Sequence, residues 1–203
     1  MARTRAQDYD AKRTAILAKA AELFARHGYA GASITMIGEA CGVSKALLYH
    51  YYPDKEAVLY DILATHLEEL NQAVDRAAAA APQGDRLYAI AAALLDSYRD
   101  ADAEHKVQLS NLTLLPPEKQ EALRDMQRAL VAQFSRAIVE ARPDLADSPL
   151  LKPMTMSLFG MLNWHYLWHR EGKGLSRDDY ARLATTLLTA GAADAIAAVT
   201  PPR

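Results

Sequence analysis

The chain has 203 residues, of which about half are hydrophobic and about a quarter are charged, and its net charge is −2. That length can bury a substantial core in one large domain or two small ones, and the composition is that of an ordinary globular protein. No apolar run approaches the ~18 residues of a membrane span, and residues 1–13 lack the apolar core of a signal peptide. We therefore expect a cytoplasmic protein with no membrane partner. Because Cys41 is the single cysteine, we also expect no internal disulfide.

Apolar residues recur at helical spacing along almost the whole chain, whereas β-branched residues are few. Ile16, Ala20 and Phe24 line one face of a first helix, which should end at His27 and Gly28. Further helices are expected at about residues 33–40, 45–51, 55–80, 85–100, 105–114, 118–141, 148–170 and 176–199. The pattern predicts an all-α fold of nine helices without a convincing strand.

Residues 33–52 have the pattern of a helix-turn-helix. Gly38 is small enough to let two helices cross closely, Gly42 can take the positive φ of a helix C-terminus, and Val43 fills the turn. Ser44 is a good N-cap for a second helix that begins with small and basic residues. Since recognition helices contact bases mainly through their N-terminal residues, this helix is expected to dock in the major groove.

Charge is distributed unevenly along the chain. Residues 1–60 carry a net charge of +2 and the remainder −4. A mildly basic head on an acidic body indicates that only the head meets nucleic acid.

Residues 12–60 resemble the N-terminal domain of the tetracycline-repressor (TetR) family of bacterial regulators, and the most specific stretch runs from Gly42 to Glu56. The matching residues are Ile16, Ala20, Leu23, Phe24, Gly28, Tyr29, Ser33, Ile37, Ala40, Gly42, Val43, Ser44, Leu48, Tyr49, Tyr51, Tyr52, Lys55, Glu56 and Leu59. The resemblance implies a nine-helix TetR-like architecture. It places a DNA-binding domain at residues 1–54 and a ligand-binding and dimerisation domain at residues 55–203.

The resemblance also implies roles for side chains of the helix-turn-helix. The positions that would hold DNA phosphates are Ser33, Ser44, Tyr49 and Lys55, those that would face the groove are Lys45, Ala46, Leu47 and His50, and Thr35 is a further candidate contact. The family often has Gly at the place of Ala46 and a hydroxyl residue at the place of Leu47. Because Leu47 can offer only an apolar contact, for example to a thymine methyl, the operator sequence cannot be borrowed from other members.

A single helix-turn-helix binds DNA weakly, whereas a dimer reads two half-sites. The two predicted helices at residues 148–170 and 176–199 are the natural dimer element, since the second carries a leucine and small-residue face suited to close packing. The resemblance implies the same arrangement. We therefore expect a homodimer on a palindromic double-stranded DNA operator; the alternative is that these helices only cover the core of a monomer.

The middle helices are expected to enclose a pocket for a small-molecule effector. The candidate lining residues are Leu109, Asn111, Met126, Leu130, Phe134, Phe159, Asn163, Trp164 and Trp168, with Leu112, Met161 and Tyr166 beside them. Methionine and aromatic side chains with a few polar groups suit an apolar ligand with one polar end. The alternative is that most of them belong to the core or to the dimer interface.

Residues 159–184 resemble the C-terminal half of TetR-family members that control fatty-acid, aromatic-acid and steroid breakdown and respond to acyl-CoA thioesters. Phenylacetyl-CoA and fatty acyl-CoA are the leading effector candidates, and Arg99, Lys106 or Arg170 could meet CoA phosphates. The alternative is an unrelated hydrophobic drug or metabolite. The expected mechanism is release of a repressor from DNA, with the helix at residues 55–80 acting as a lever between ligand and reader.

Metal, cofactor and catalytic chemistry have little support in the sequence. His165 and His169 have a metal-compatible spacing but no further ligands complete a tetrahedral set. Cys41 fits a small buried residue, with a redox-sensing thiol as the alternative. Since no nucleophile elbow or phosphate-binding glycine loop is found, we expect no cofactor and no enzyme; an all-helical enzyme or scaffold is the remote alternative.

Overall fold

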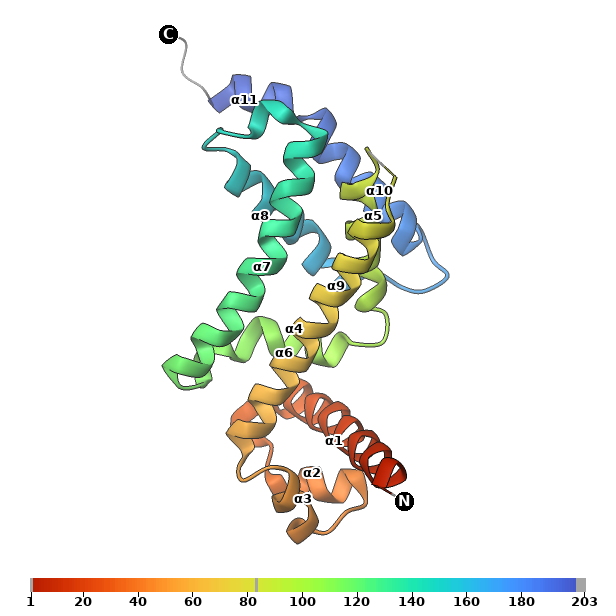
Figure 1. Ribbon diagram of the computed structural model, residues 1–203, viewed down its shortest axis with the longest axis vertical. Helices are drawn as coiled ribbons and strands as arrows, with labels where there is room; N and C mark the ends of the chain where they lie inside the picture. The colour runs from red at the N-terminus through yellow and green to blue at the C-terminus, as the bar shows by residue number, and fades with distance from the viewer. Residues whose placement is uncertain (1, 83, 200–203) are drawn as a thin grey trace. The chain divides into compact units, whose positions relative to one another are not determined.

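The computed structural model describes residues 2–82 and 84–199, with side chains described from residue 8 onward. The described residues form helices and no named strand, which confirms the all-α prediction (Figure 1). The helices are α1 (Ala2–Gly31), α2 (Ile34–Cys41), α3 (Lys45–Tyr51), α4 (Lys55–Ala80), α5 (Arg86–Ser97), α6 (Asp102–Asn111), α7 (Pro117–Ala141), α8 (Leu151–Asn163), α9 (His165–Trp168), α10 (Arg177–Ala190) and α11 (Ala192–Val199). Short 3₁₀ turns follow α6 and α7 at Leu112–Leu114 and Pro143–Leu145.

The chain packs as two compact units. The first is Met1–Glu68 with Ala101–Asp125, and the second is Glu69–Asp100 with Met126–Arg203. Helices α4 and α7 each contribute residues to both units. The functional boundary expected after residue 54 remains a prediction, since packing units and functional domains need not coincide.

The first unit is built around α1, which packs against α2 and α6, while α2 packs against α3 (Figure 1). Its fully buried side chains include Ile16, Phe24, Ile37, Leu48 and Leu59. Burying side chains of this size contributes about 1.5–3 kcal/mol each. This small core holds the helix-turn-helix together.

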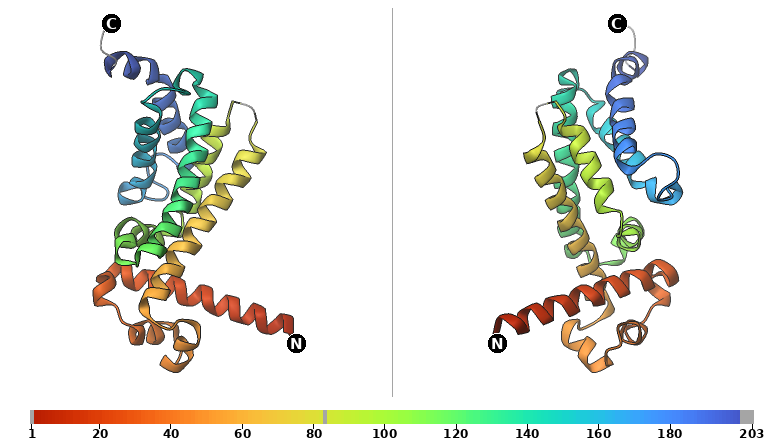
Figure 2. Two further views of the ribbon diagram at one scale, coloured as in Figure 1. Left: turned by 60° about the vertical axis from the view of Figure 1, so that its left-hand side comes forward. Right: turned by 90° about the vertical axis from the view of Figure 1, so that its right-hand side faces the viewer.

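The second unit has its own hydrophobic core, in which α10 lies against α5 and α8 (Figure 2). The rings of Phe134 on α7 and Phe159 on α8 pack with centroids 4.7 Å apart. Large fully buried residues of the unit include Leu70, Ile90, Leu94 and Phe134.

Three helices differ from the sequence prediction. Helix α1 begins at Ala2, well before Ile16, and Gly28 at φ 71° interrupts it near its end. The helix expected at residues 148–170 is broken after Asn163, where a run of aromatic and histidine residues of modest helix propensity begins. The helix expected at residues 176–199 bends by 43° between α10 and α11, at Gly191, and glycine is a frequent position for such kinks.

No single helix among the described residues is long and apolar enough to cross a membrane; α10 and α11 reach the required length and hydropathy only when the bent pair is taken together.

Candidate DNA interface and effector site

Two serine caps and one glycine shape the helix-turn-helix. Ser33 Oγ accepts the Met36 N–H at 3.2 Å and begins α2. Ser44 Oγ accepts the Leu47 N–H at 3.1 Å and begins α3. Gly42 ends α2 in the left-handed region, at φ 64°. The Ser44 N-cap and the glycine turn expected from the sequence are therefore confirmed, and Ser33 is a second N-cap. Both serine hydroxyls keep their own proton, which can still be donated to another group.

Close approach of α2 and α3 depends on Gly38. A Cβ at this position would lie 3.2 Å from the Val43 carbonyl oxygen, which is a tight contact, and 3.9 Å from Leu48 Cδ2. The Val43 N–H donates to the Gly38 carbonyl at 2.9 Å, and Leu48 is fully buried. Leu48 is therefore the buried anchor of α3 in this pair of helices, and other side chains of α3 remain exposed.

Four of the residues predicted to meet DNA, namely Lys45, Ala46, Tyr49 and His50, are exposed on α3. Tyr49 is 46% exposed, and the Lys45 ammonium lies 5.8 Å from the centroid of its ring. The exposed members of the predicted set are Ser33, Thr35, Ser44, Lys45, Ala46, Tyr49 and His50, and the half-buried ones are Leu47 and Lys55. These residues belong to α2, α3, their N-caps and the start of α4, and their contacts with DNA stay a prediction.

Lys55 has an internal role that the sequence did not reveal. Its ammonium donates to the carbonyl oxygens of Tyr29 at 2.6 Å and Ala32 at 2.9 Å, and lies 4.2 Å from the centroid of the Tyr29 ring. These bonds tie the start of α4 to the end of α1. One of its three donors is left over for a DNA phosphate.

Two tyrosines at the end of α3 have partners elsewhere in the first unit. The Tyr51 ring stacks on Tyr9 of α1, and the Tyr52 hydroxyl donates to Asp61 of α4. Asp61 also binds the guanidinium of Arg13 on α1. Sequence reasoning missed Tyr9, Arg13 and Asp61, because only the folded chain brings them to the recognition helix.

A pair of buried histidines joins α4 and α6 in the first unit. The rings of His66 and His105 have centroids 6.0 Å apart, and both residues are almost fully buried. Burial, with a smaller effect of His105, lowers the pKa of His66 to about 3. His66 is therefore neutral at physiological pH.

The nine predicted effector-binding residues lie in three settings. Leu130, Phe134 and Phe159 are buried in the core of the second unit, in which Met126 and Asn163 are half-buried. Leu109 is exposed and Asn111 half-buried in the first unit. Trp164 and Trp168 are 55% and 54% exposed. Their role in binding an effector stays a prediction.

Asn163 is held by a hydrogen bond within the second unit. Its Oδ1 accepts from the hydroxyl of Tyr98, at 2.9 Å. Burial raises the pKa of Tyr98, so that this phenol remains a donor.

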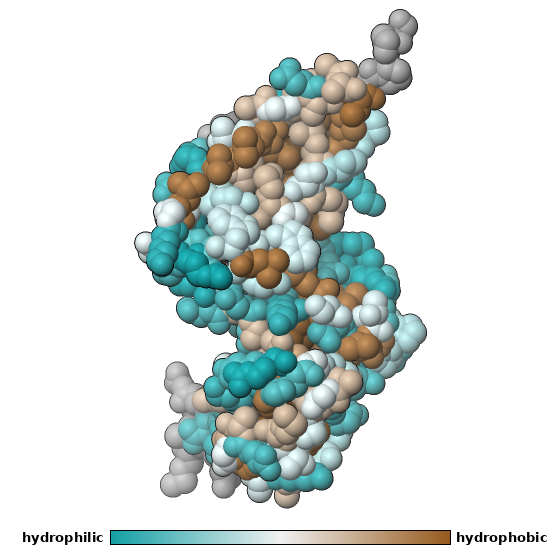
Figure 3. Space-filling model, turned by 180° about the vertical axis from the view of Figure 1, so that it is seen from behind, coloured by the Kyte–Doolittle hydropathy of each residue, from teal (hydrophilic) through white to brown (hydrophobic). Residues whose placement is uncertain are grey.

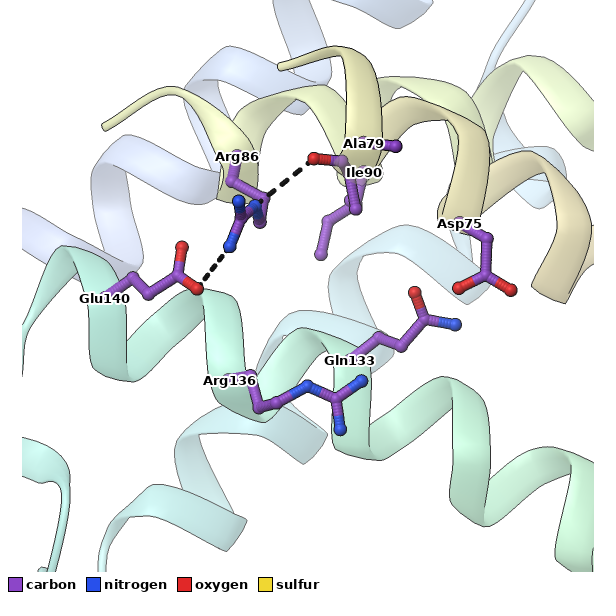
Figure 4. A pocket seen from close by; sticks show the side chains of 8 residues that line it. Asp75, Ala79, Arg86, Ile90, Gln133, Arg136 and Glu140 are labelled. Atoms are coloured by element: carbon purple, nitrogen blue, oxygen red, sulfur yellow. Dashed lines mark hydrogen bonds and ion pairs between the residues drawn. The ribbon is translucent and has the colours of Figure 1, made fainter. Parts of the chain in front are cut away.

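A polar cleft of about 270 Å³ lies between α4, α5 and α7 of the second unit (Figure 4). Its lining residues are Asp75, Ala78, Ala79, Arg86, Ile90, Gln133, Arg136 and Glu140. The Arg86 guanidinium donates to Glu140 and to the Ala78 carbonyl. Among the described residues, this lining shares no member with the nine predicted ones. In the sequence these charges cannot be told from solvated residues on helix surfaces.

The three cations proposed for CoA phosphates have other partners. Arg99 pairs with Asp96 and Glu171. Lys106 donates to the Ala25 carbonyl, and Arg170 to the His169 carbonyl.

Large hydrophobic side chains are exposed on the C-terminal helices, where Figure 3 shows hydrophobic residues gathered on the surface. The exposed residues are Met156, Trp164, Leu167, Trp168, Leu175, Leu183, Leu187 and Val199. Exposed apolar patches of this kind mark interaction surfaces.

Cys41 and the His165–His169 pair give little support to redox or metal chemistry. Burial raises the pKa of the half-buried Cys41 thiol, which disfavours a reactive thiolate.

The His165 and His169 rings stack with centroids 4.3 Å apart, and within the described residues no group of three metal-ligating side chains is found. Burial, followed by the nearby His169, lowers the pKa of His165 to about 4.

Two curated relatives match about a third of the chain or less. The putative mycofactocin biosynthesis transcriptional regulator MftR of Mycobacterium tuberculosis is 38% identical over 56 residues, 28% of each chain. The HTH-type transcriptional regulator RutR of Escherichia coli is 38% identical over 64 residues, which cover 32% of this chain and 30% of RutR. The chain thus matches less than a third of the length of these two proteins.

Solved structures match almost the whole chain. A TetR-family transcriptional regulator from Bordetella parapertussis is 36% identical with a TM-score of 0.81, and the match covers 87% of this chain and 93% of that one. AibR in complex with isovaleryl coenzyme A and operator DNA is 24% identical with a TM-score of 0.75, over 88% of this chain and 98% of that one. The likeness to AibR shows a shared fold.

Two family descriptions cover most of the chain. Residues 16–62 match the bacterial regulatory proteins of the tetR family, and residues 80–192 match the tetracyclin repressor-like C-terminal domain. The second match alone spans more than half of the chain. The chain therefore belongs to the tetracycline-repressor family of transcriptional regulators, which pair a DNA-binding domain with a ligand-binding domain and are not enzymes.

Proposed function

We propose that this regulator is a repressor that binds a palindromic operator as a homodimer in the bacterial cytoplasm and is released by a small effector. The observation that carries the proposal is the exposure of Lys45, Ala46, Tyr49 and His50 on α3, while the buried Leu48 anchors the helix. A short helix with this distribution can enter the major groove and leave its anchor undisturbed.

The proposed roles of the individual residues are those that the resemblance to the TetR family implies. Ser33, Ser44, Tyr49 and Lys55 would hold phosphates, because hydroxyl and ammonium donors fix register on the DNA backbone, and Thr35 is a further candidate contact. Lys45, Ala46, Leu47 and His50 would face base edges. Residues 1–54 would thus form the DNA-binding domain and residues 55–203 the ligand-binding and dimerisation domain.

The proposed dimer forms through α8 to α11. Leu187 is 58% exposed and Leu183 41% exposed on α10, and Trp164 and Trp168 of the preceding segment are 55% and 54% exposed. Removing such side chains from water provides the main driving force for association. Leu187→Asp should therefore produce monomers in sedimentation, with weaker operator binding and an intact helical spectrum.

The proposed effector is an acyl-CoA thioester such as phenylacetyl-CoA or a fatty acyl-CoA. The resemblance of residues 159–184 to acyl-CoA-responsive members supports it, and so does the fold shared with AibR. Arg136 lines the polar cleft and makes no ion pair with any other described residue, so its guanidinium is available for a phosphate. An unrelated hydrophobic drug or metabolite is the second candidate, favoured by the apolar core that contains Phe134 and Phe159.

The test has two stages. A binding-site selection on random duplexes should yield a two-fold symmetric sequence, with affinity that falls steeply as salt rises. Each acyl-CoA is then titrated into the complex, with free CoA and the free acid as controls. An acyl-CoA that leaves operator affinity unchanged is excluded as the effector, because a ligand that binds both states equally shifts nothing. Failure to select any sequence contradicts the DNA-binding proposal itself.

A further inference from the structure

The N-terminal part of α1 reaches the recognition helix. Tyr9 and Arg13 are four residues apart on α1, so that their side chains lie on one face of the helix, one turn from each other. Tyr9 contacts Tyr51 at the end of α3, and Arg13 binds Asp61 on α4.

Tyr9 holds the last residue of α3. Its ring stacks on that of Tyr51 with centroids 4.6 Å apart and 21° between the planes. Offset stacking of this kind stabilises a pair of aromatic side chains beyond the area that they bury. Tyr51 also meets the His50 ring edge-on, with centroids 5.9 Å apart. The stack therefore reaches a side chain predicted to face the groove.

Arg13 is linked to Tyr52, the residue after Tyr51, through the carboxylate of Asp61. Its Nε donates to Asp61 Oδ2 at 2.9 Å and its second terminal nitrogen donates to Oδ1, a bidentate pair between α1 and α4. The Tyr52 hydroxyl donates to the same carboxylate, and Tyr52 is only 5% exposed. Charge-assisted bonds in this fork geometry are strong and directional.

These contacts fix both ends of a very short helix. Helix α3 has seven residues, too few to be stable or oriented alone. Ser44 caps its start and Leu48 anchors its middle, while Tyr51 and Tyr52 secure its end through α1 and α4. Its orientation therefore depends on residues that lie on other helices.

We propose that Tyr9, Arg13 and Asp61 are positioning residues, which set the angle of the recognition helix and so determine how strongly the protein prefers its operator over other DNA. Base readout needs each side chain to meet a particular edge, whereas non-specific binding depends on phosphate charge and tolerates a tilted helix. The proposal rests on the proposed reading of DNA by α3.

The main test compares Tyr9→Ala with Tyr9→Phe in the full-length protein. Thr14→Ala is the matched control, an exposed α1 position whose hydroxyl bonds only back to Asp10 of the same helix in the described structure. Affinities are measured for the selected operator and for a scrambled duplex at one salt concentration. Tyr9→Ala should lower operator affinity roughly threefold to tenfold and leave scrambled-DNA affinity unchanged, while Tyr9→Phe and Thr14→Ala match the parent.

Tyr52→Phe tests the second arm of the arrangement. It removes only a hydroxyl from a buried ring, so the fold should survive, and it should also lower the ratio of operator to scrambled affinity. Equal losses on both duplexes, or no loss in either Tyr9→Ala or Tyr52→Phe, would overturn the positioning role. A parent protein that prefers no sequence would instead overturn the proposed function together with this inference.

Discussion

The helix-turn-helix and the core of the second unit differ in how many side chains they bury. In the first, α2 and α3 bury few side chains, Leu48 among them, and keep polar side chains on the surface. In the second, α5, α7, α8 and α10 bury a continuous apolar cluster that includes Phe134 and Leu158. The helix-turn-helix is thus held by caps and a few buried side chains, whereas the second unit is held by a large apolar core. Mutations should therefore separate DNA recognition from stability.

Substitution in the core of the second unit should have the strongest effect on stability. Phe134→Ala removes a fully buried ring and leaves a cavity, so the free energy of unfolding should fall by about 3–5 kcal/mol. Chemical denaturation followed by circular dichroism measures it, with the half-buried Val131→Ala as a milder control. The folded variant should retain the operator affinity of the parent protein. A loss of operator affinity under conditions in which the variant is fully folded would contradict the separation of DNA recognition from stability.

Acidification should weaken the first unit through His66. Because burial lowers its folded-state pKa to about 3, the unfolded chain binds the proton first as the pH falls below about 6.5. This histidine's contribution is complete above pH 6.5 and is lost toward pH 3, by about 1.4 kcal/mol per pH unit. Between pH 6.5 and 5 the loss is thus about 2 kcal/mol from this group.

His66→Gln should flatten that part of the profile of unfolding free energy against pH. His27→Gln, an exposed position on α1, is the control and should leave the profile unchanged. A profile that is equally steep in the parent and in His66→Gln would remove His66 as the source of acid sensitivity.

Two serine caps provide a matched pair of smaller changes. Ser44 caps α3 and Ser176 caps α10, and each Oγ accepts a backbone N–H three residues on. Ser44→Ala and Ser176→Ala should each cost about 1 kcal/mol of stability. Only Ser44→Ala should also weaken operator binding, as measured by fluorescence anisotropy. Equal DNA affinities of the two variants would show that the Ser44 hydroxyl does not touch phosphate.

The smallest expected effect concerns Lys55. Loss of one phosphate contact in Lys55→Ala should weaken binding to all duplexes and lower the slope of log affinity against log salt by about one unit. An unchanged slope would leave Lys55 only its bonds to the Tyr29 and Ala32 carbonyls. Measuring the melting temperature beside the slope separates these two roles.

The two regions also differ in how well the sequence predicts them. Gly42 and Ser44 act on backbone groups within a few residues, so the turn and the cap of α3 are predicted correctly. Lys55 binds carbonyls 23 and 26 residues away, and Tyr9 meets Tyr51 across the fold, which no local pattern indicates. Such contacts exist only once tertiary packing is known.

In the second unit, helical periodicity in the sequence predicts the helices. It does not predict where they break or which of their side chains are exposed. The apolar side chains of Phe134 and Trp168 give the same signal, although the first is fully buried and the second is more than half exposed. The polar cleft around Arg136 is lined by charges that sequence alone assigns to solvent. The effector site is thus the part least accessible to prediction.

The N-terminal half of α3 is proposed to read base edges, and Lys45 provides the sharpest test of this role. Binding-site selection should be run in parallel on the parent protein and on Lys45→Ala. We expect the parent to select a palindrome and Lys45→Ala to lose its preference at one symmetric position in each half-site, with the other positions kept. Identical selected sequences for the two proteins would contradict the proposed readout by Lys45, and no selected sequence for the parent would contradict DNA reading by α3 altogether.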